Sequence, residues 1–356
     1  MTKAIANTPK PNFSTSILGW LMKDRQRLQT LIILAVLILM LAGFTSASDQ
    51  FLELTNFLNV ARKISPLIIV ASAATLVMIA RGMDLSSGSI VAASAVLAAY
   101  LSAQGMNIWL AYILAILLGT VIGMINSFVI VKMRVSPIIS TLGTMNIARG
   151  IAYLISPSAI LVGLPDSWDI IGTSYIGPVP TSVVIAGVVF IVFHILLTQT
   201  IFGRHVYAIG GNEETARLSG VNVEKVTAIL YIMLGTMAGL GAIVMASRLG
   251  SGDPNIGVGF EFDVIVAIIL GGTSLAGGEG RLLGTLIGTL IVGFLSTGLN
   301  LAGVDPFWQY VAKGVILIFA VALDRFVNMG VLTMSADKSR QKIPTLAPSN
   351  VNEPTK

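Results

Sequence analysis

The sequence contains no cysteine, only two histidines (His194 and His205) and few charged residues, which make up 11% of 356 residues. The absence of cysteine excludes disulfides and thiolate metal sites, and two histidines are too few for a histidine-built metal centre. We therefore expect no metal site. A soluble domain carries about 25% charged residues. This chain is 54% hydrophobic with a mean hydropathy of +0.86, which indicates an integral membrane protein.

The chain also lacks the motifs of nucleotide hydrolysis and of common hydrolytic catalysis. It contains no Gly-x-x-x-x-Gly-Lys-Ser/Thr phosphate loop, no His-Glu-x-x-His and no nucleophile elbow. We therefore expect no catalytic residue and no cofactor bound by this chain. Uphill movement of a solute would need an ion gradient or a separate ATPase. We attribute the net charge of +5 to cytoplasmic loops of a membrane protein, not to a nucleic-acid surface.

The apolar segments predict an all-α polytopic membrane protein. About 17–25 apolar residues cross the hydrocarbon core as a helix, and the sequence offers about ten candidates, with short or broken segments among them. The predicted spans are Leu28–Phe44, Ile64–Ala80, Gly88–Leu101, Ile108–Val131, Pro137–Leu154, Ser182–Ile201, Val226–Ser247, Val264–Ala276, Leu282–Leu299 and Phe307–Leu323. The first is expected to be an uncleaved span and not a signal peptide.

The distribution of basic residues predicts that both termini are cytoplasmic. An even number of spans places most Lys and Arg in inner segments, whereas the outer loop 156–180 carries Asp166 and Asp169 but no basic residue. Arg248 falls in an outer loop, and Arg62 and Lys63 also depart from the rule, so we expect residues 51–63 to form an interfacial segment. The expected organisation is a cytoplasmic tail at 1–27, a transmembrane permease domain at 28–327 and a second cytoplasmic tail at 328–356.

Two polar interruptions border unusually short apolar segments: RGMDLSSGS at 81–89 and GGTSLAGGEGR at 271–281. Broken segments at membrane depth are tolerated where they line protein or water, and in transporters they mark the pathway. Ordinary cytoplasmic turns and interhelical hydrogen bonds explain the same residues, and the sequence leaves both interpretations open. The candidate pathway residues are Asp84, Ser86, Ser87, Asn126, Thr141, Thr144, Asn146, Arg149, Thr273, Ser274, Asn300, Gln309 and Lys313.

Three Gly-x-x-x-Gly pairs have a different interpretation. The pairs Gly119/Gly123, Gly235/Gly239 and Gly284/Gly288 lie within predicted spans. Small residues at this spacing allow two helix backbones to approach closely. We therefore predict that they are packing positions and not part of a substrate site.

The segment Gly203–Lys225 holds a short helix signal between two long apolar stretches. Asn212 is suited to the N-cap, Glu213 and Glu214 occupy the first turn, and Gly220 follows the last helical residue. A helix of about seven residues is not stable alone in water. We infer that it docks on a protein outside the bilayer.

Five ordered stretches resemble the permease subunits of ribose-type ABC sugar importers, a family that includes permeases for galactose, arabinose, xylose and fructose. They are GMDLSSGS at 82–89, INSFVIVKMRVSPIISTLGTMNIARG at 125–150, GRHVYAIGGNEETARLSGVNV at 203–223, FEFDVIVAIILGGTSLAGGEG at 260–280 and GLNLAGVDPFWQYVAKGVILIFAVALDR at 298–325. The family often has Gly-Gly-Ile-Asp-Leu-Ser-Val-Gly where this chain has Arg81 to Gly88. Arg81 therefore stands where glycine is common.

The resemblance implies a bacterial inner-membrane protein with several partners. These would be a second permease copy, identical or paralogous, a cytoplasmic ATPase that uses ATP and Mg²⁺, and a periplasmic or lipid-anchored sugar-binding protein. The 203–225 loop would contain the coupling helix that enters a groove on the ATPase. Its residues would be Gly211, Asn212, Glu213, Glu214, Ala216, Arg217, Leu218, Ser219 and Gly220.

Two other classes of protein compete with the sugar permease. An ion-coupled secondary transporter of a small polar solute would need a carboxylate exposed to the pathway, and Asp84 is the best candidate. A membrane scaffold or receptor component would need no pathway. The sequence does not specify which sugar would be carried.

Overall fold

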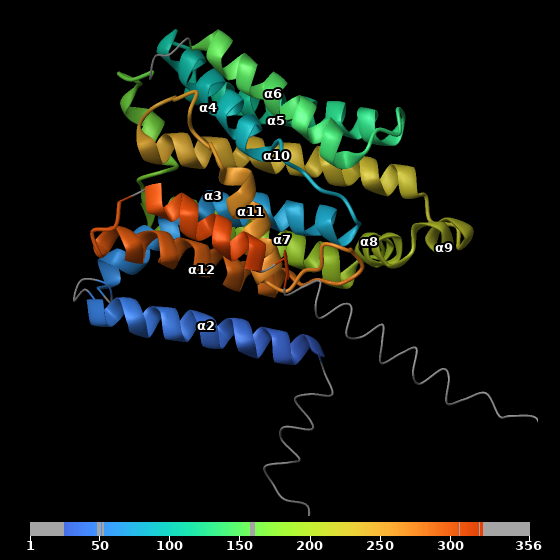
Figure 1. Cartoon of the computed structure of the whole chain (residues 1–356). Coiled ribbons are helices and arrows are strands. Elements are labelled where there is room, and N and C mark those ends of the chain that lie inside the picture. The colour runs from blue at the N-terminus through green and yellow to red at the C-terminus, as the bar shows by residue number, and fades with distance from the viewer. Residues whose placement is uncertain are drawn as a thin grey trace, which may run out of the picture.

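The computed structural model describes residues 25–47, 51, 53–156, 161–305, 307–319 and 321–322. The predicted tails, apart from residues 25–27, lie outside these residues. Helices dominate the described part of the chain, and strand there is confined to β1 (Tyr175–Ile176) and β2 (Val179–Pro180), which pair antiparallel. Figure 1 shows the long helices lying side by side, with the short α8 and α9 at one end. We call this the α9 end of the bundle.

The elements follow one another as a string of helices with short connections. The long or apolar helices are α2 (Arg25–Ala47), α3 (Leu54–Ile79), α4 (Ser87–Ala103), α5 (Ile108–Val131), α6 (Pro137–Ile155), α7 (Thr181–Gln199), α10 (Val223–Leu249), α11 (Phe260–Leu270), α12 (Leu282–Leu301) and a last helix, Phe307–Phe319. The 3₁₀ helix η2 (Asp166–Ile170), α8 (Ile201–Gly211) and α9 (Glu213–Leu218) connect them.

Among the described residues, six helices are long and apolar enough to cross a membrane: α3, α5, α6, α7, α10 and α12. The prediction for residues 108–131 is confirmed to the residue, since α5 is Ile108–Val131. The shorter α4 has 17 residues and α11 has 11. At 1.5 Å per residue α11 is about 16 Å long, roughly half of the hydrocarbon core. The predicted span Val264–Ala276 is therefore wrong as a complete crossing.

Residues 51–63 do not form a separate interfacial segment, which corrects that prediction. Residues from Leu54 onward belong to α3, which continues without a break past Lys63 and Pro66 to Ile79. Most of α3 is buried, and side chains such as Ile69, Val70 and Leu76 are fully enclosed. The first turns of α3 are exposed or half-buried, whereas the part from Ile64 onward is almost wholly buried, and both parts belong to one continuous helix.

The helix backbones approach closely at glycines, as the sequence predicts. A Cβ added at Gly119 would lie 2.4 Å from the Gly235 carbonyl oxygen, and one at Gly235 would lie 2.3 Å from the Gly119 oxygen. Gly284 and Gly288 meet the backbones of Gly271 and Ala267 in the same way. The Gly-x-x-x-Gly pairs are thus packing positions, which place α5 against α10 and α12 against α11.

A third interruption follows α10, where residues 250–259 turn back into the bundle (Figure 1). Gly252 packs against Ala99 of α4, and Gly257 packs against Gly88 at the beginning of the same helix. The segment therefore runs along α4, and α11 begins inside the bundle at Phe260. Positive φ angles at Gly257 and Gly259, 74° and 76°, allow these turns, because the left-handed region favours glycine.

Candidate functional site

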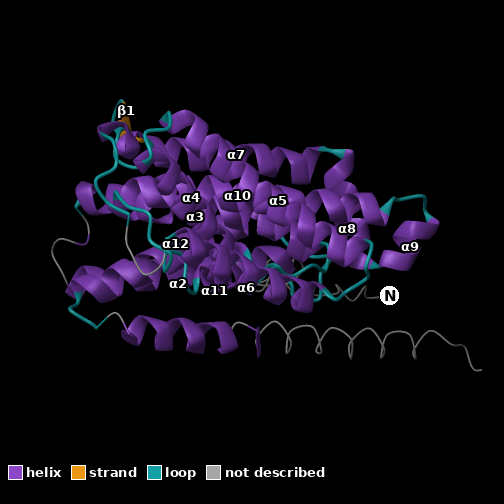
Figure 2. Ribbon diagram, turned by 90° about the horizontal axis from the view of Figure 1, so that it is seen from above, coloured by secondary structure: helices purple, strands orange, loops and turns teal. Residues whose placement is uncertain are grey.

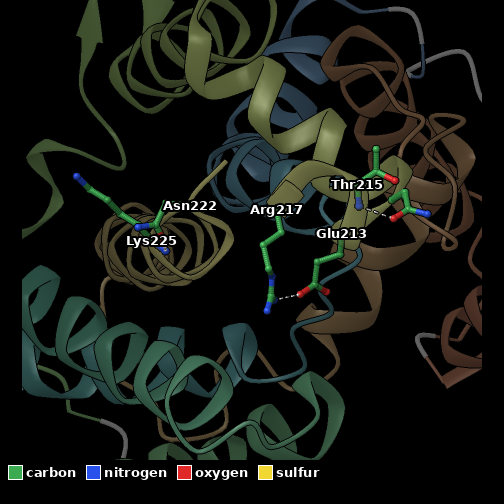
Figure 3. Close-up of polar contacts among 6 residues, drawn as sticks. Glu213, Thr215, Arg217, Asn222 and Lys225 are labelled. Carbon is green, nitrogen blue, oxygen red and sulfur yellow. Dashed lines mark hydrogen bonds and ion pairs between the residues drawn. The ribbon is translucent and has the colours of Figure 1, made fainter. Parts of the chain in front are cut away.

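The helix α9 is short, capped and exposed. The Asn212 side chain accepts a hydrogen bond from the Thr215 N–H at 2.9 Å, as predicted for the N-cap, and Glu213 and Glu214 lie in the first turn. Glu213 and Arg217 form an i,i+4 ion pair at 2.8 Å (Figure 3). Gly220 follows the helix with φ of 88°, the left-handed conformation expected after a helix end. Leu218 is 80% exposed, so α9 presents an apolar side chain outward.

The preceding α8 attaches α9 to the bundle, and the sequence did not predict it as a separate helix. The predicted span Ser182–Ile201 ends earlier in the structure, because α7 stops at Gln199 and Thr200 caps the new helix. The Thr200 side chain accepts from the Gly203 N–H at 3.2 Å. Val206 and Ile209 of α8 are buried in the core, so α8 is held in the bundle while α9 projects from it.

Both polar interruptions predicted from the sequence meet α8 at a single junction. The Arg81 guanidinium donates through Nη2 to the Gly211 oxygen at 2.9 Å and through Nε to the Ala276 oxygen at 3.0 Å. The Gly278 N–H donates to the Ile79 oxygen at 2.8 Å. The end of α3, the 271–281 loop and the end of α8 are therefore connected directly, and we call these contacts the coupling junction.

Close backbone packing and one half-buried phenol complete the coupling junction. A Cβ at Gly210 would lie 1.8 Å from the Ile79 oxygen and 2.5 Å from the Gly278 nitrogen. The Tyr207 hydroxyl donates to the Gly280 oxygen at 2.7 Å. Burial raises the pKa of Tyr207 above its usual range, so the hydroxyl stays protonated and remains a donor. The end of α8, which leads directly into α9, is therefore joined to the 271–281 loop by short, direct contacts.

A buried polar network joins the beginning of α4 to α5 and α6. Asp84 accepts from the Ser86 and Ser87 N–H groups at 3.0 and 2.8 Å and from the Ser86 hydroxyl at 2.8 Å. Asn126 donates to the Ser86 hydroxyl at 3.0 Å and accepts from the Thr144 hydroxyl at 2.6 Å. Asp84 is 9% exposed and Asn126 is 1% exposed. The Asp84 carboxylate therefore caps a helix inside protein and does not face open solvent.

The remaining candidates do not join this network. Thr141 is buried and donates to the Pro137 oxygen of its own helix, and Asn146 is exposed and donates to the Leu142 oxygen. Gln309 donates to Asn300 at 2.6 Å and accepts from Ser296, which in turn accepts from Lys63. In the structure these residues form hydrogen bonds within or between helices. This is the simpler of the two interpretations that the sequence left open.

The other four candidates lie in the interrupted segments or contact these segments or α11. Arg149 of α6 donates to the Pro254 and Ile256 oxygens at 2.6 and 3.0 Å and so holds the 250–259 segment. Lys313 pairs with Asp263 of α11 at 2.8 Å. Thr273 is buried in the 271–281 loop, and its hydroxyl has no hydrogen-bond partner within the described ranges. Ser274 accepts from the Ala276 N–H in the same loop.

Sequence reasoning missed Glu261, which lies in the first turn of α11 over Gly88. It is 7% exposed, and its Oε2 has no hydrogen-bond partner among the described residues. The sequence did contain a signal for Glu261, because charged residues inside an apolar stretch are rare and functional. The predicted span begins at Val264, after the FEFD run, and the predicted interruptions do not include the break at 250–259.

These features define a class of protein: a membrane-embedded helical bundle with interrupted segments in its interior and one projecting, capped helix at its end. Residues 56–321 match the family model for the permease component of branched-chain amino acid transport systems. The chain belongs to this family of transport permeases and is a multi-pass membrane protein.

Several curated relatives are similar over most of the chain. It is 39% identical to the ribose import permease protein of Escherichia coli K12 over 310 residues, covering 86% of this chain and 94% of the relative. It is 36% identical to the L-arabinose transport system permease protein of the same strain over 297 residues, covering 83% and 89%. The D-allose transport system permease protein is 35% identical over 302 residues, covering 84% and 91%. No solved structure matches the chain.

Proposed function

We propose that this chain is the permease subunit of an ATP-driven importer that moves a monosaccharide, ribose or a related pentose or hexose, into a bacterial cell. The observation that carries the proposal is α9, a capped and exposed helix joined to the two interrupted segments by the coupling junction. The sugar relatives at 35–39% identity support the substrate class.

The proposed partners follow from the α9 end. A cytoplasmic ATPase binds α9 and uses ATP and Mg²⁺, while this chain binds no cofactor itself. A second permease copy completes the translocation unit in the inner membrane, and a periplasmic or lipid-anchored binding protein delivers the sugar at the opposite end. Lys132, Arg134 and Arg204 near the α9 end support a cytoplasmic position for that end, with ten membrane segments and both termini cytoplasmic.

The coupling junction suggests how force is transmitted. Closure of the ATPase pair displaces α9, and the Arg81 hydrogen bonds pass this displacement to the end of α3 and to the 271–281 loop. The polar groups around Asp84, Asn126 and Glu261 then become accessible in turn to each side. Hydroxyl-rich solutes suit such groups, because amide and carboxylate side chains can replace their hydrogen bonds to water.

Reconstitution in liposomes tests the proposal. The full chain is combined with a cognate ATPase and sugar-binding protein, and uptake of radiolabelled ribose, arabinose and allose is measured with ATP inside the vesicles. We expect uptake that requires ATP, the binding protein and the intact ATPase. A Glu213→Lys variant should insert normally but lose uptake, because it reverses a charge on the docking helix. Normal uptake by that variant would contradict the role of α9.

The same assay separates the two rivals. An ion-coupled transporter would accumulate solute without the ATPase and would stop when a protonophore is added. Full hydrogen bonding of Asp84 in a buried position argues against its use as an exposed coupling carboxylate. A scaffold would give no ATP-dependent uptake with any partner or sugar.

A further inference from the structure

Three basic side chains gather at the end of the bundle opposite α9. Arg62 and Lys63 lie in α3, and Arg248 lies in the last turn of α10, whose 27 residues separate it from α9 by about 40 Å. Because α3 packs against α10, and one loop contacts Arg62 through Tyr175 and Arg248 through Gly172, the three basic side chains lie in one region of the bundle. These are the same residues that departed from the expected distribution of basic residues along the sequence.

The positive charge in this cluster is not balanced. Lys63 donates to the Ser296 hydroxyl, and the acid that acts on it, Asp263, is already paired with Lys313 at 2.8 Å. Nε and Nη2 of Arg62 and Nε of Arg248 are buried without a hydrogen-bond partner in the part of the chain that the structure describes. Buried N–H groups of a charged guanidinium are unfavourable without an acceptor, so this cluster favours the binding of an anion.

The loop 166–180 covers both arginines. The Tyr175 ring lies 4.8 Å from Cζ of Arg62, and the Gly172 N–H donates to Ser247 beside Arg248 at 2.8 Å. A Cβ added at Gly172 would lie 2.2 Å from the backbone nitrogen of Arg248, so the loop is packed onto α10. Asp169 of this loop lies beside the end of α10, with its Oδ1 3.8 Å from a Cβ added at Gly250, but neither Asp166 nor Asp169 forms an ion pair with either arginine among the described residues. Figure 2 shows the β1 hairpin of this loop and α9 at opposite ends of the molecule.

We propose that Arg62 and Arg248 bind a phosphate group beneath the 166–180 loop, with Lys63 adding positive charge. Guanidinium groups suit this ligand, because their planar N–H pairs match phosphate oxygens in a bidentate geometry. The proposal is independent of the transport function above. Tyr175 and Ile176 of the hairpin are 52% and 57% exposed, and aromatic residues favour the headgroup level of a bilayer. A phospholipid headgroup and free phosphate offer the same chemistry, and the experiment distinguishes them.

The test uses the purified full chain in a neutral detergent. Thermal unfolding is measured for the wild type, Arg62→Gln, Arg248→Gln and a matched control, Arg204→Gln, an exposed cation at the α9 end. Each is titrated with phosphatidylglycerol in mixed micelles, with a zwitterionic lipid, and with sodium phosphate against sodium chloride at equal ionic strength. We expect the midpoint of the wild type and of Arg204→Gln to rise by several degrees, since a ligand that binds the folded state stabilises it. Both glutamine variants at the cluster should lose most of that shift.

The outcomes decide both the site and the source of the phosphate. A shift with phosphatidylglycerol alone identifies a lipid headgroup, and a shift with inorganic phosphate identifies a free anion. Equal shifts in the wild type and both cluster variants, or no shift with either ligand, would overturn the proposal. If the glutamine variants do not fold, Arg62→Lys and Arg248→Lys keep the charge but lose the bidentate fork, and they should show a reduced ligand-dependent shift. Undiminished shifts in the lysine variants would also overturn it.

Discussion

The Arg81 guanidinium at the end of α3 donates to the Gly211 oxygen at the end of α8, with 2.9 Å between Nη2 and the oxygen. This contact joins residues 130 positions apart in sequence. Arg81 also adopts φ of 64°, a conformation that disfavours side chains larger than glycine. The backbone at Arg81 thus places its guanidinium, a charged donor, between the end of α8 and the 271–281 loop.

Replacement of Arg81 should separate folding from coupling. Arg81→Gly relieves the positive φ but removes both hydrogen bonds, each worth about 1 kcal/mol at an exposed site. We expect little change in thermal unfolding in detergent and a severalfold loss of ATP-dependent uptake in proteoliposomes. Arg204→Gly, which alters an exposed arginine nearby, serves as the control. Unchanged uptake by Arg81→Gly would show that the contact does not transmit movement.

Gly220 should tolerate asparagine but not valine. Its φ of 88° is accessible to glycine and, less readily, to asparagine, whereas a β-branched residue is strained there by roughly 1–2 kcal/mol. Nothing lies within 4 Å of an added Cβ, so the effect is conformational and not steric crowding by neighbours. Uptake and binding of the purified ATPase should fall in Gly220→Val and recover largely in Gly220→Asn. Equal loss in both variants would point to a different role for the position.

The α5–α10 contact should be sensitive to a single methyl group. In Gly119→Ala the new Cβ would meet the Gly235 oxygen at 2.4 Å, and overpacking of this kind costs about 1–3 kcal/mol. We expect a lower unfolding midpoint and a lower yield of folded protein in detergent. Gly143→Ala is the matched control, because nothing lies within 4 Å of that Cβ. The packing interpretation fails if both variants unfold at the same temperature.

The Asn126–Thr144 hydrogen bond should give a measurable interaction energy in a double-mutant cycle. Thr144→Val leaves the buried Asn126 oxygen without its donor, at about 1–3 kcal/mol, whereas Asn126→Ala removes the same bond but leaves the Thr144 hydroxyl the Ser140 and Thr141 oxygens. The double variant should be less destabilised than the sum of the two, by roughly 0.5–3 kcal/mol, as for residues in one network. The free energies of unfolding of the wild type, the two single variants and the double variant are measured by chemical unfolding in mixed micelles. Additive effects would mean that the hydrogen bond does not contribute.

The structure confirms the local predictions for the short helix. Asn212, Glu213, Glu214 and Gly220 occupy the predicted positions, because capping and turn preferences act within a few residues. The break at 250–259 was not predicted, since its glycines resemble those that merely pack helices. Their contacts with Gly88 and Ala99 depend on residues more than 150 positions away.

The amino-acid sequence by itself determined the membrane class, the position of most helices and the cap of α9, because hydropathy and capping depend on neighbouring residues. It also contained the close-packing glycines, whose spacing is that of a helix face. Only the tertiary structure decided which polar residues meet. Asp84 and Asn126 form one network, Arg81 connects α3 to Gly211, and Arg62 and Arg248 converge under a loop. Such meetings depend on how distant helices pack, and the composition of each helix does not specify that arrangement.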